Sequence, residues 1–317
     1  MSSRHSNHRV QKHTVTAPRG SSTSRQSSTL RSSKSSTNES NGLYDHGFQQ
    51  HLTDYGIFPG LYVSPEGHIA PKPSNWDDIR QRLAKRRSSL SPSRSVQEDF
   101  EEFARSAAHA SKEMQVTETV IPFIEGKIAD RRCISGGIPL KNLDHLTDGT
   151  LVPGNPDRYY GARPEQLNRQ IRTELDDQIV PSSQHDPVAP NFFLAVKGPD
   201  GLSSVAKRQA CYDGALGARG IHSLQEYGKD VPEFDNKAYT ISSTYHDGNL
   251  KMFTSHPSKS ATTGRPEYYM TQLRSFALTD HVDAFREGAT WYRNGRDWAK
   301  EQRDEAIKRA NERALNN

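Results

Sequence analysis

The feature that most constrains the fold is an apolar run that delivers a lysine to its end, Asn191-Phe-Phe-Leu-Ala-Val-Lys197. The next four residues, Gly198-Pro-Asp-Gly201, are typical of a tight turn. Helical periodicity then extends over residues 203–216. The pattern predicts a buried strand, a turn and a helix in direct succession.

The start of the chain differs in composition from the rest. Its first 40 residues hold 13 Ser, 5 Thr and 7 Lys or Arg against one acid, so we expect residues 1–41 to form a disordered Ser/Arg-rich tail. Outside the first 40 residues, 35 Lys and Arg face 37 Asp and Glu, and the net charge changes from +4 to −2. The folded part is therefore not globally basic, and the overall charge does not identify a partner.

Two segments flank the expected core. Residues 42–96 predict an aromatic arm that packs on its own domain, a short helix over residues 76–87 and a linker. Residues 280–317 predict a long C-terminal helix, whose mixed charges are typical of a solvated helix and not of a DNA-reading one.

Residues 97–279 predict the core itself. A helix is expected over residues 97–126, then two or three strands, then the central strand with its helix, and finally a hairpin that turns at Asp247-Gly248. Residues 164–179 are helical between two strands, which indicates an insertion. The fold class expected is α/β (α+β), with a central mixed sheet flanked by helices.

Cysteine usage and hydropathy indicate the compartment. Cys133 and Cys211 have no metal-ligand spacing, which argues against a disulfide framework and structural zinc. No run is long and apolar enough to span a bilayer, so we expect no membrane association and an intracellular protein. The basic tail and Lys85-Arg-Arg87 leave a nuclear and a cytoplasmic location open.

The central strand also places chemistry. Residues two apart in a strand share a face, so Ala195 and Lys197 point the same way. In a metal-dependent phosphodiesterase, a carboxylate at the first of these positions holds a divalent ion, and the lysine orients the attacking water or stabilises the developing charge. A second carboxylate comes from a neighbouring strand, and Asp157, after Pro156, is the best candidate for it.

These residues carry a resemblance. Pro156-Asp157 and Phe193-Leu-Ala-Val-Lys197, followed by a helix with Gln209 and Tyr212, resemble the PD-(D/E)XK nuclease (restriction-endonuclease-like) superfamily. Over roughly residues 42–315 the chain also looks like a group of uncharacterised fungal proteins with this fold. The resemblance implies Asp157 as a Mg²⁺ or Mn²⁺ ligand, Lys197 as the catalytic lysine, Gln209 as a helix-borne polar partner, and a glutamate two residues before the lysine.

That glutamate is absent, because Ala195 stands in its place. Three other carboxylates are candidates for a relocated ligand: Asp186, Asp200 and Asp213. Structural alternatives exist for all three implied residues, since Asp157 in a Pro-Asp turn is ordinary and without the resemblance would be assigned a structural role. Lys197 can simply reach water from the end of a buried strand, and Gln209 can bond a strand carbonyl.

Three functions follow from these residues. The first is a nuclease-like domain with a degenerate metal site that binds nucleic acid or another partner. The second is an active Mg²⁺- or Mn²⁺-dependent nuclease with a relocated carboxylate. The third is a non-enzymatic interaction or scaffold protein that uses the arm and the tail to bind other proteins. The sequence leaves the choice between enzyme and binding module open.

Overall fold

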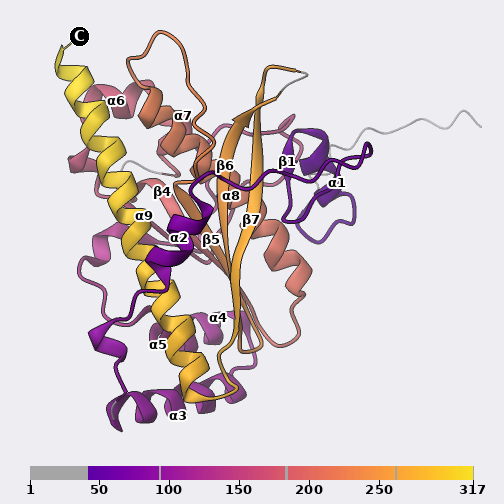
Figure 1. Cartoon of the computed structure of the whole chain (residues 1–317), viewed down its shortest axis with the longest axis vertical. Helices are drawn as coiled ribbons and strands as arrows, with labels where there is room; N and C mark the ends of the chain where they lie inside the picture. Colours follow the sequence, from indigo (N-terminus) through magenta and orange to yellow (C-terminus); the bar gives the residue numbers. More distant parts are fainter. Residues whose placement is uncertain (1–41, 93, 183–184, 261–262, 317) are drawn as a thin grey trace, which may run out of the picture. The chain divides into compact units, whose positions relative to one another are not determined.

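The computed structural model describes residues 42–316, except residues 93, 183–184 and 261–262. The expected disordered tail, residues 1–41, lies outside the described residues. Within the described part, no helix is long and apolar enough to cross a membrane. The same part contains one seven-stranded mixed sheet flanked by helices, which confirms the fold class (Figure 1).

The strand order is β1-β7-β6-β5-β4-β3-β2. Pairing is antiparallel throughout the described sheet except for β4 with β5 and β1 with β7, which are parallel. The strands are β1 Ile57–Phe58, β2 Ile134–Ser135, β3 Arg158–Ala162, β4 Val188–Lys197, β5 Thr240–His246, β6 Asn249–Lys259 and β7 Pro266–Ala277. The core thus runs through three antiparallel strands, β2 to β4, and reaches the parallel strand β5 through α8 Ser203–Glu226. The predicted strand, turn and helix are therefore confirmed.

Two long helices cover opposite faces of the sheet. The buried strand β4 sends Phe193 toward α8, where a Cβ on Gly217 would lie 2.5 Å from the ring. It sends Phe192 to the other face, where a Cβ on Gly295 of α9 Val282–Asn316 would lie 3.3 Å from that ring. Figure 1 shows α9 running along the sheet on the side away from α8. Glycine at both positions lets each helix approach the central strand closely.

The helix expected over residues 97–126 is interrupted. Residues 110–112 separate α3 Arg94–His109 from a second helical stretch. That stretch consists of α4 Glu113–Gln115, the π-helical turn η2 Val116–Val120 and α5 Ile121–Glu125. Pro122 lies at the start of α5, where a missing N–H is tolerated. The π turn immediately before the proline accommodates the lost hydrogen bond.

The connection between β3 and β4 contains the expected insertion as three short pieces instead of one helix. They are the 3₁₀ turn η4 Pro164–Gln166, α6 Arg169–Glu174 and α7 Asp176–Ile179. Asn168 caps α6 by accepting a hydrogen bond from the N–H of Gln170. This cap explains why one periodic stretch divides after residue 167.

The hairpin at Asp247-Gly248 is confirmed, because both residues have positive φ, 45° and 71°, as a two-residue turn of this type requires. The second strand of this hairpin, β6, also pairs with β7, a strand that the sequence patterns did not predict. Buried residues alternate in β7 up to Met270 and then skip to Leu273, because a bulge opposite Met252 and Phe253 inserts an extra residue.

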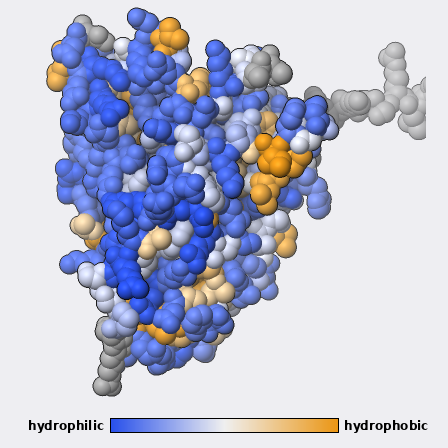
Figure 2. Space-filling model, in the orientation of Figure 1, coloured by the Kyte–Doolittle hydropathy of each residue, from blue (hydrophilic) through white to orange (hydrophobic). Residues whose placement is uncertain are grey.

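The aromatic arm packs on its own domain, as expected. It adds α1 Phe48–Asp54 and the edge strand β1, neither of which was predicted. Phe58 stacks on Tyr62 at 4.6 Å and on Tyr269 of β7 at 5.0 Å. The arm also exposes Leu61, Val63 and Ile69, and Figure 2 shows an apolar patch over this part of a largely hydrophilic face.

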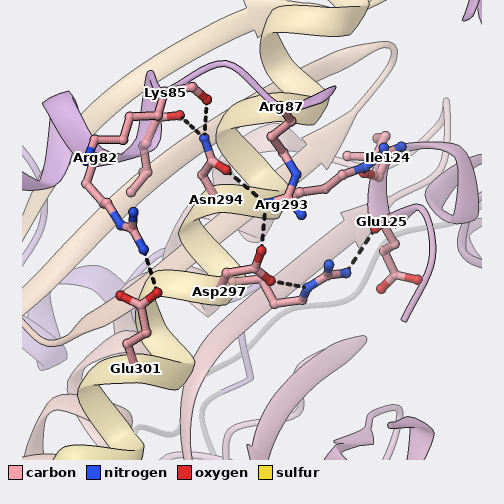
Figure 3. A network of polar contacts seen from close by, with 11 residues as sticks. Arg82, Lys85, Arg87, Ile124, Glu125, Arg293, Asn294, Asp297 and Glu301 are labelled. Carbon is pink, nitrogen blue, oxygen red and sulfur yellow. Dashed lines mark hydrogen bonds and ion pairs between the residues drawn. The ribbon is translucent and has the colours of Figure 1, made fainter. Parts of the chain in front are cut away.

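Polar side chains of α9 hold two other helices by their C-terminal carbonyls (Figure 3). Asn294 donates to the carbonyls of Leu83 and Lys85 at the end of α2 Trp76–Leu83. At the end of α5, Arg293 donates to Phe123 and Ile124 and Arg296 donates to Glu125. The last carbonyls of a helix have no partner within that helix, so these donors satisfy them and fix both helices on α9.

Candidate functional site

The structure brings Asp157 and Lys197 to the same end of the sheet. Asp157 immediately precedes β3, and its Oδ2 accepts a 2.7 Å hydrogen bond from the backbone N–H of Val196 in β4. Lys197 ends β4 and is only 5% exposed. Its Nζ donates to the carbonyl of Val196 at 2.7 Å. The carboxylate and the ammonium group are therefore both held against the same residue of the central strand.

A third charged group, Glu113, completes this cluster. Its Oε2 lies 2.9 Å from Lys197 Nζ, and its carboxylate is close enough to Asp157 to raise the pKa of that residue. Glu113 is partly exposed, whereas Lys197 is buried. Two carboxylates and one ammonium group thus meet where α4 approaches the ends of β3 and β4.

The environment of Asp157 favours its protonated form. Burial raises its pKa to about 7, and the adjacent Glu113 carboxylate acts in the same direction. The Val196 N–H and the Lys197 ammonium group oppose the shift. Two juxtaposed carboxylates of this kind share a proton or a cation, because both cannot be ionised without compensation.

Two glycines permit the close approach of the three elements. A Cβ on Gly198 would lie 2.9 Å from the backbone nitrogen of Glu113. A Cβ on Gly136, just after β2, would lie 2.1 Å from the carbonyl oxygen of Asp157. Only a residue without a side chain fits at either contact. Gly198 therefore serves the position of Glu113 as well as the turn after β4.

The cluster opens on a groove of about 990 Å³. Its described lining comes from the α4 to α5 stretch, the segment after α5, and the ends of β2 and β3. The charged residues among it are Glu113, Glu118, Glu125, Asp157, Arg131 and Arg158. Arg158 lies 3.3 Å from Glu125, so that pair is already balanced. Glu113 is paired with Lys197, which lies outside this lining, and Asp157 favours its protonated form. A bound cation would therefore have to displace the lysine and a proton from these two carboxylates.

The three relocated-ligand candidates lie in different places. Asp186 precedes β4 and hydrogen-bonds Ser182, so it lies at the opposite end of that ten-residue strand from Lys197. Asp200 is exposed in the turn after β4. Asp213, on α8, is 1% exposed, and its carboxylate oxygens make no hydrogen bond within the described part of the chain.

Of the three candidates, Asp213 is the one whose pKa responds to the charges of Asp157 and Lys197. Burial raises its pKa well above the usual range, the Asp157 charge raises it further, and Lys197 lowers it. It does not line the groove. Its Oδ1 instead packs on Gly154, where a Cβ would lie 2.5 Å away. The geometry therefore describes a neutral, buried carboxyl behind the cluster.

Ala195 and Gln209 stay on the α8 face of the sheet. Ala195 is buried and paired with Thr244 of β5, so no oxygen occupies the position two residues before the lysine. The Gln209 amide donates to the carbonyl of Asn155 at 2.5 Å. That contact ties α8 to the turn before Asp157, which corresponds to the structural alternative and leaves the site role a prediction.

A family model described as "Domain of unknown function (DUF7924)" matches residues 108–310, which is 203 of the 317 residues. The chain belongs to this family. No curated protein and no solved structure matches it. Glu113, Asp157 and Lys197 all lie inside the DUF7924 region, whereas the tail and the arm precede it.

At the cluster described above, the DUF7924 region presents two carboxylates, Asp157 and Glu113. Among the described residues, no group of three or more His, Cys, Asp or Glu side chains is placed to hold a metal ion. Mg²⁺ commonly binds through one or two carboxylates and takes its remaining ligands from water and substrate phosphates. Asp157 and Glu113, which lie next to each other at the mouth of the groove, fit this donor set.

Glu113 is the one member of the cluster that sequence reasoning missed. The helix expected over residues 97–126 placed it in mid-helix, with no reason to meet a strand. In the structure the side chain of Gln115 accepts hydrogen bonds from the N–H and the hydroxyl of Ser111. Their four-residue spacing is not that of a capping box, and the N-cap Lys112 makes no side-chain cap, so the sequence carried no local sign of this helix start.

Proposed function

We propose that this DUF7924 protein is a metal-dependent phosphodiesterase that acts on nucleic acid, with Asp157 and Glu113 as the ligands of Mg²⁺ or Mn²⁺. The observation that carries the proposal is the 2.9 Å contact between Lys197 and Glu113, which joins the two predicted residues to a second carboxylate. The missing glutamate at position 195 is thus replaced by one from a helix, and not by Asp186, Asp200 or Asp213.

Each side chain has a distinct task in this proposal. Asp157, held by the Val196 N–H, provides a fixed oxygen, and the partly exposed Glu113 provides one that can adjust. A bound divalent ion supplies the nucleophile by lowering the pKa of its water from about 16 toward about 7. Lys197, desolvated and close to both carboxylates, stabilises the negative charge that develops on the phosphoryl oxygens.

The chain topology supports the same proposal. A helix followed by three antiparallel strands, a crossover helix and a parallel strand is the order expected for a PD-(D/E)XK core, and it is the order of α3 to β5 here. The cluster also lies where that family would place its metal ligands, at the start of β3 and the end of β4. We keep an intracellular location, nuclear or cytoplasmic, in the proposal, because Cys133 and Cys211 are both free thiols.

A degenerate binding domain is the second candidate. The buried Ala195, paired inside the sheet, is the observation that favours it. Four of the six charged residues that line the groove are acidic, so phosphate binding there would still require a cation. For this candidate, Ala195→Glu should raise the affinity for Mn²⁺ without restoring cleavage. An Ala195→Glu protein that folds but binds Mn²⁺ no better counts against an inherited pocket.

The test of activity compares five full-length proteins on plasmid DNA, single-stranded DNA and RNA, with Mg²⁺ or Mn²⁺. We expect cleavage by the wild type and a loss of at least ~100-fold in Asp157→Asn, Glu113→Gln and Lys197→Met. Asp200→Asn is the matched control, because Asp200 is exposed three residues after Lys197. Cleavage that survives all three substitutions would contradict the proposal. Loss of cleavage in Asp200→Asn would instead assign the second metal ligand to Asp200 in the turn after β4.

A further inference from the structure

A second cavity, of about 300 Å³, lies beside the groove. The segment between α5 and β2 forms one wall, and α9 forms the other. We call this cavity the cationic pocket, because five of its described lining residues are basic and two are Asp. The basic residues are Arg87, Lys127, Arg296, Lys300 and Arg303.

Both carboxylates of the cationic pocket already have cationic partners. Asp130 accepts two hydrogen bonds from the Arg132 guanidinium, at 3.0 and 3.2 Å. Asp297 lies 2.6 Å from Arg87 and 3.5 Å from Arg296, and Figure 3 shows Arg87 reaching toward it from the α2 side of α9. Neither carboxylate is therefore free to compensate the other cations of the pocket.

Arg303 is a buried cation of this pocket with no carboxylate among its described hydrogen-bond acceptors; the Asp304 charge acts on it, but Asp304 is the ion-pair partner of Lys300. It is 2% exposed. Its Nη1 donates to two neutral oxygens, Asn191 Oδ1 at 2.7 Å and the carbonyl of Tyr160 at 3.3 Å. Its Nε makes no hydrogen bond to any described residue. A guanidinium group withdrawn from water in this way is costly unless an anion compensates it.

Two lysines provide adaptable charge to the same cavity. Lys127 is exposed on the segment after α5, and Lys300 extends from α9, where Asp304 is its ion-pair partner. Long exposed lysines can turn toward an anion at small cost, whereas Arg303 and Arg296 are fixed by their contacts to Asn191 and to the Glu125 carbonyl. The pocket thus combines fixed donors with mobile ones.

We propose that the cationic pocket binds a phosphate group. Guanidinium groups and ammonium groups together match the several acceptor oxygens and the charge of a phosphate. A cavity of about 300 Å³ lies at the lower end of the range for small-molecule sites. It therefore admits a phosphate together with part of a nucleotide, and not a folded partner.

The position of the pocket suggests two sources for that phosphate. Ile128 lines both the pocket and the groove. Tyr160 of the pocket follows Asp157 by three strand residues, which corresponds to about 10 Å along β3. The phosphate is thus either the end of a strand that occupies the groove, or a free mononucleotide or inorganic phosphate. Neither source depends on the proposed metal site.

The experiment measures phosphate binding by the full-length protein in metal-free buffer. Inorganic phosphate is titrated by calorimetry, and single-stranded oligonucleotides with a 5′-phosphate, a 3′-phosphate or neither are titrated by fluorescence anisotropy. The variants are Lys127→Gln/Lys300→Gln at the exposed positions and Arg303→Met at the buried one. Lys308→Gln is the matched control, since Lys308 is exposed on α9 outside the pocket.

We expect the double lysine variant to weaken phosphate binding by at least ~10-fold, because it removes two charge-assisted contacts. Lys308→Gln should bind as the wild type does. Asp157→Asn should also bind normally, which separates this site from the proposed metal site. If the double lysine variant weakens binding only of the oligonucleotides with a terminal phosphate, the natural ligand is the end of a strand. If it also weakens binding of inorganic phosphate, the natural ligand is a free phosphate compound.

Cys133 provides a readout that does not require Arg303→Met to fold. This thiol lines the pocket, whereas Cys211 is buried. Phosphate should therefore slow the alkylation of Cys133 in the wild type and not in the double lysine variant. The proposal is overturned if neither inorganic phosphate nor a terminal phosphate binds, or if binding and protection are the same in wild type and variant.

Discussion

Lys197 Nζ lies 2.9 Å from Glu113 Oε2, although 84 positions separate the two residues in the chain. The lysine ends the central strand, and the glutamate begins a helix that the break at residues 110–112 brings over that strand end. Asp157 lies close enough to the same glutamate for that carboxylate to raise its pKa. The candidate site is therefore made by the contact of a helix start with two strand ends, and changes at this contact should affect it first.

The glycine under that contact gives the first prediction. A Cβ at position 198 would lie 2.9 Å from the Glu113 backbone nitrogen, so Gly198→Ala forces α4 away from β4. We expect a loss of about 1–3 kcal/mol in the free energy of unfolding. The cleavage rate should fall by more than the loss of folded protein explains. Urea unfolding measures the stability, and the cleavage rate is measured at a temperature well below the unfolding transition. Gly42→Ala, where φ is not positive and a Cβ would meet no atom within 4 Å, controls for the loss of a glycine.

The clamp on α5 gives a second prediction. Arg293 donates to two carbonyls at the end of this helix, and Gly126 follows it with φ of 61°. Arg293→Met should remove both bonds and destabilise the protein by about 1–3 kcal/mol. Hydrogen exchange should rise selectively over residues 121–126 and spread to α4. Unchanged protection in this stretch would mean that packing alone holds the helix.

The local pattern predicted only part of this arrangement. The central strand, its turn and α8 were predictable because apolar runs, turn residues and helical periodicity are all local signals. The strand β7 was not, because the bulge at Leu273 breaks the two-residue alternation. The parallel pairing of β1 with β7 could not be predicted either, because a strand of two residues is too short to show a periodic pattern.

The site shows the same division. Lys197 could be proposed because it ends a strand with a readable pattern, and Asp157 because Pro156-Asp157 resembles the motif of a known family. The partner glutamate depends on where one helix stops and another starts. That break is set by tertiary contacts. Gly198 accommodates α4, and α9 holds the carbonyl end of α5. No pattern within residues 97–126 specifies those contacts, so the sequence favoured one continuous helix.

Asp213 gives a third prediction, on stability and pH. Burial raises its pKa well above the usual range, so the folded state keeps its proton where the unfolded state releases it above about pH 4. The Asp213 carboxyl therefore does not lower the free energy of unfolding at low pH, where both states are protonated, but lowers it increasingly as the pH rises above about 4. Asp213→Asn should raise the melting temperature at pH 7.5 and have little effect near pH 3.5. A lower melting temperature at pH 7.5 would contradict this account.

His256 gives a fourth prediction, with the opposite sign. It is fully buried beside Tyr269, and burial lowers its pKa from 6.5 to about 4. Because the unfolded state takes up the proton first, stability should be lost as the pH falls from about 6.5 to about 4, by up to about 3 kcal/mol. His256→Gln should flatten this part of the stability profile. An equally steep profile in His256→Gln would assign the acid sensitivity to other groups.

The central claim is that Glu113 and Asp157 together hold the metal, and calorimetric titration of Mn²⁺ into the full-length protein tests it most directly. We predict one site in the wild type and in Asp200→Asn, and a loss of at least ~10-fold in affinity in both Glu113→Gln and Asp157→Asn. If Glu113→Gln binds Mn²⁺ as tightly as the wild type, the glutamate is only the ion-pair partner of Lys197, and the account of the site is wrong.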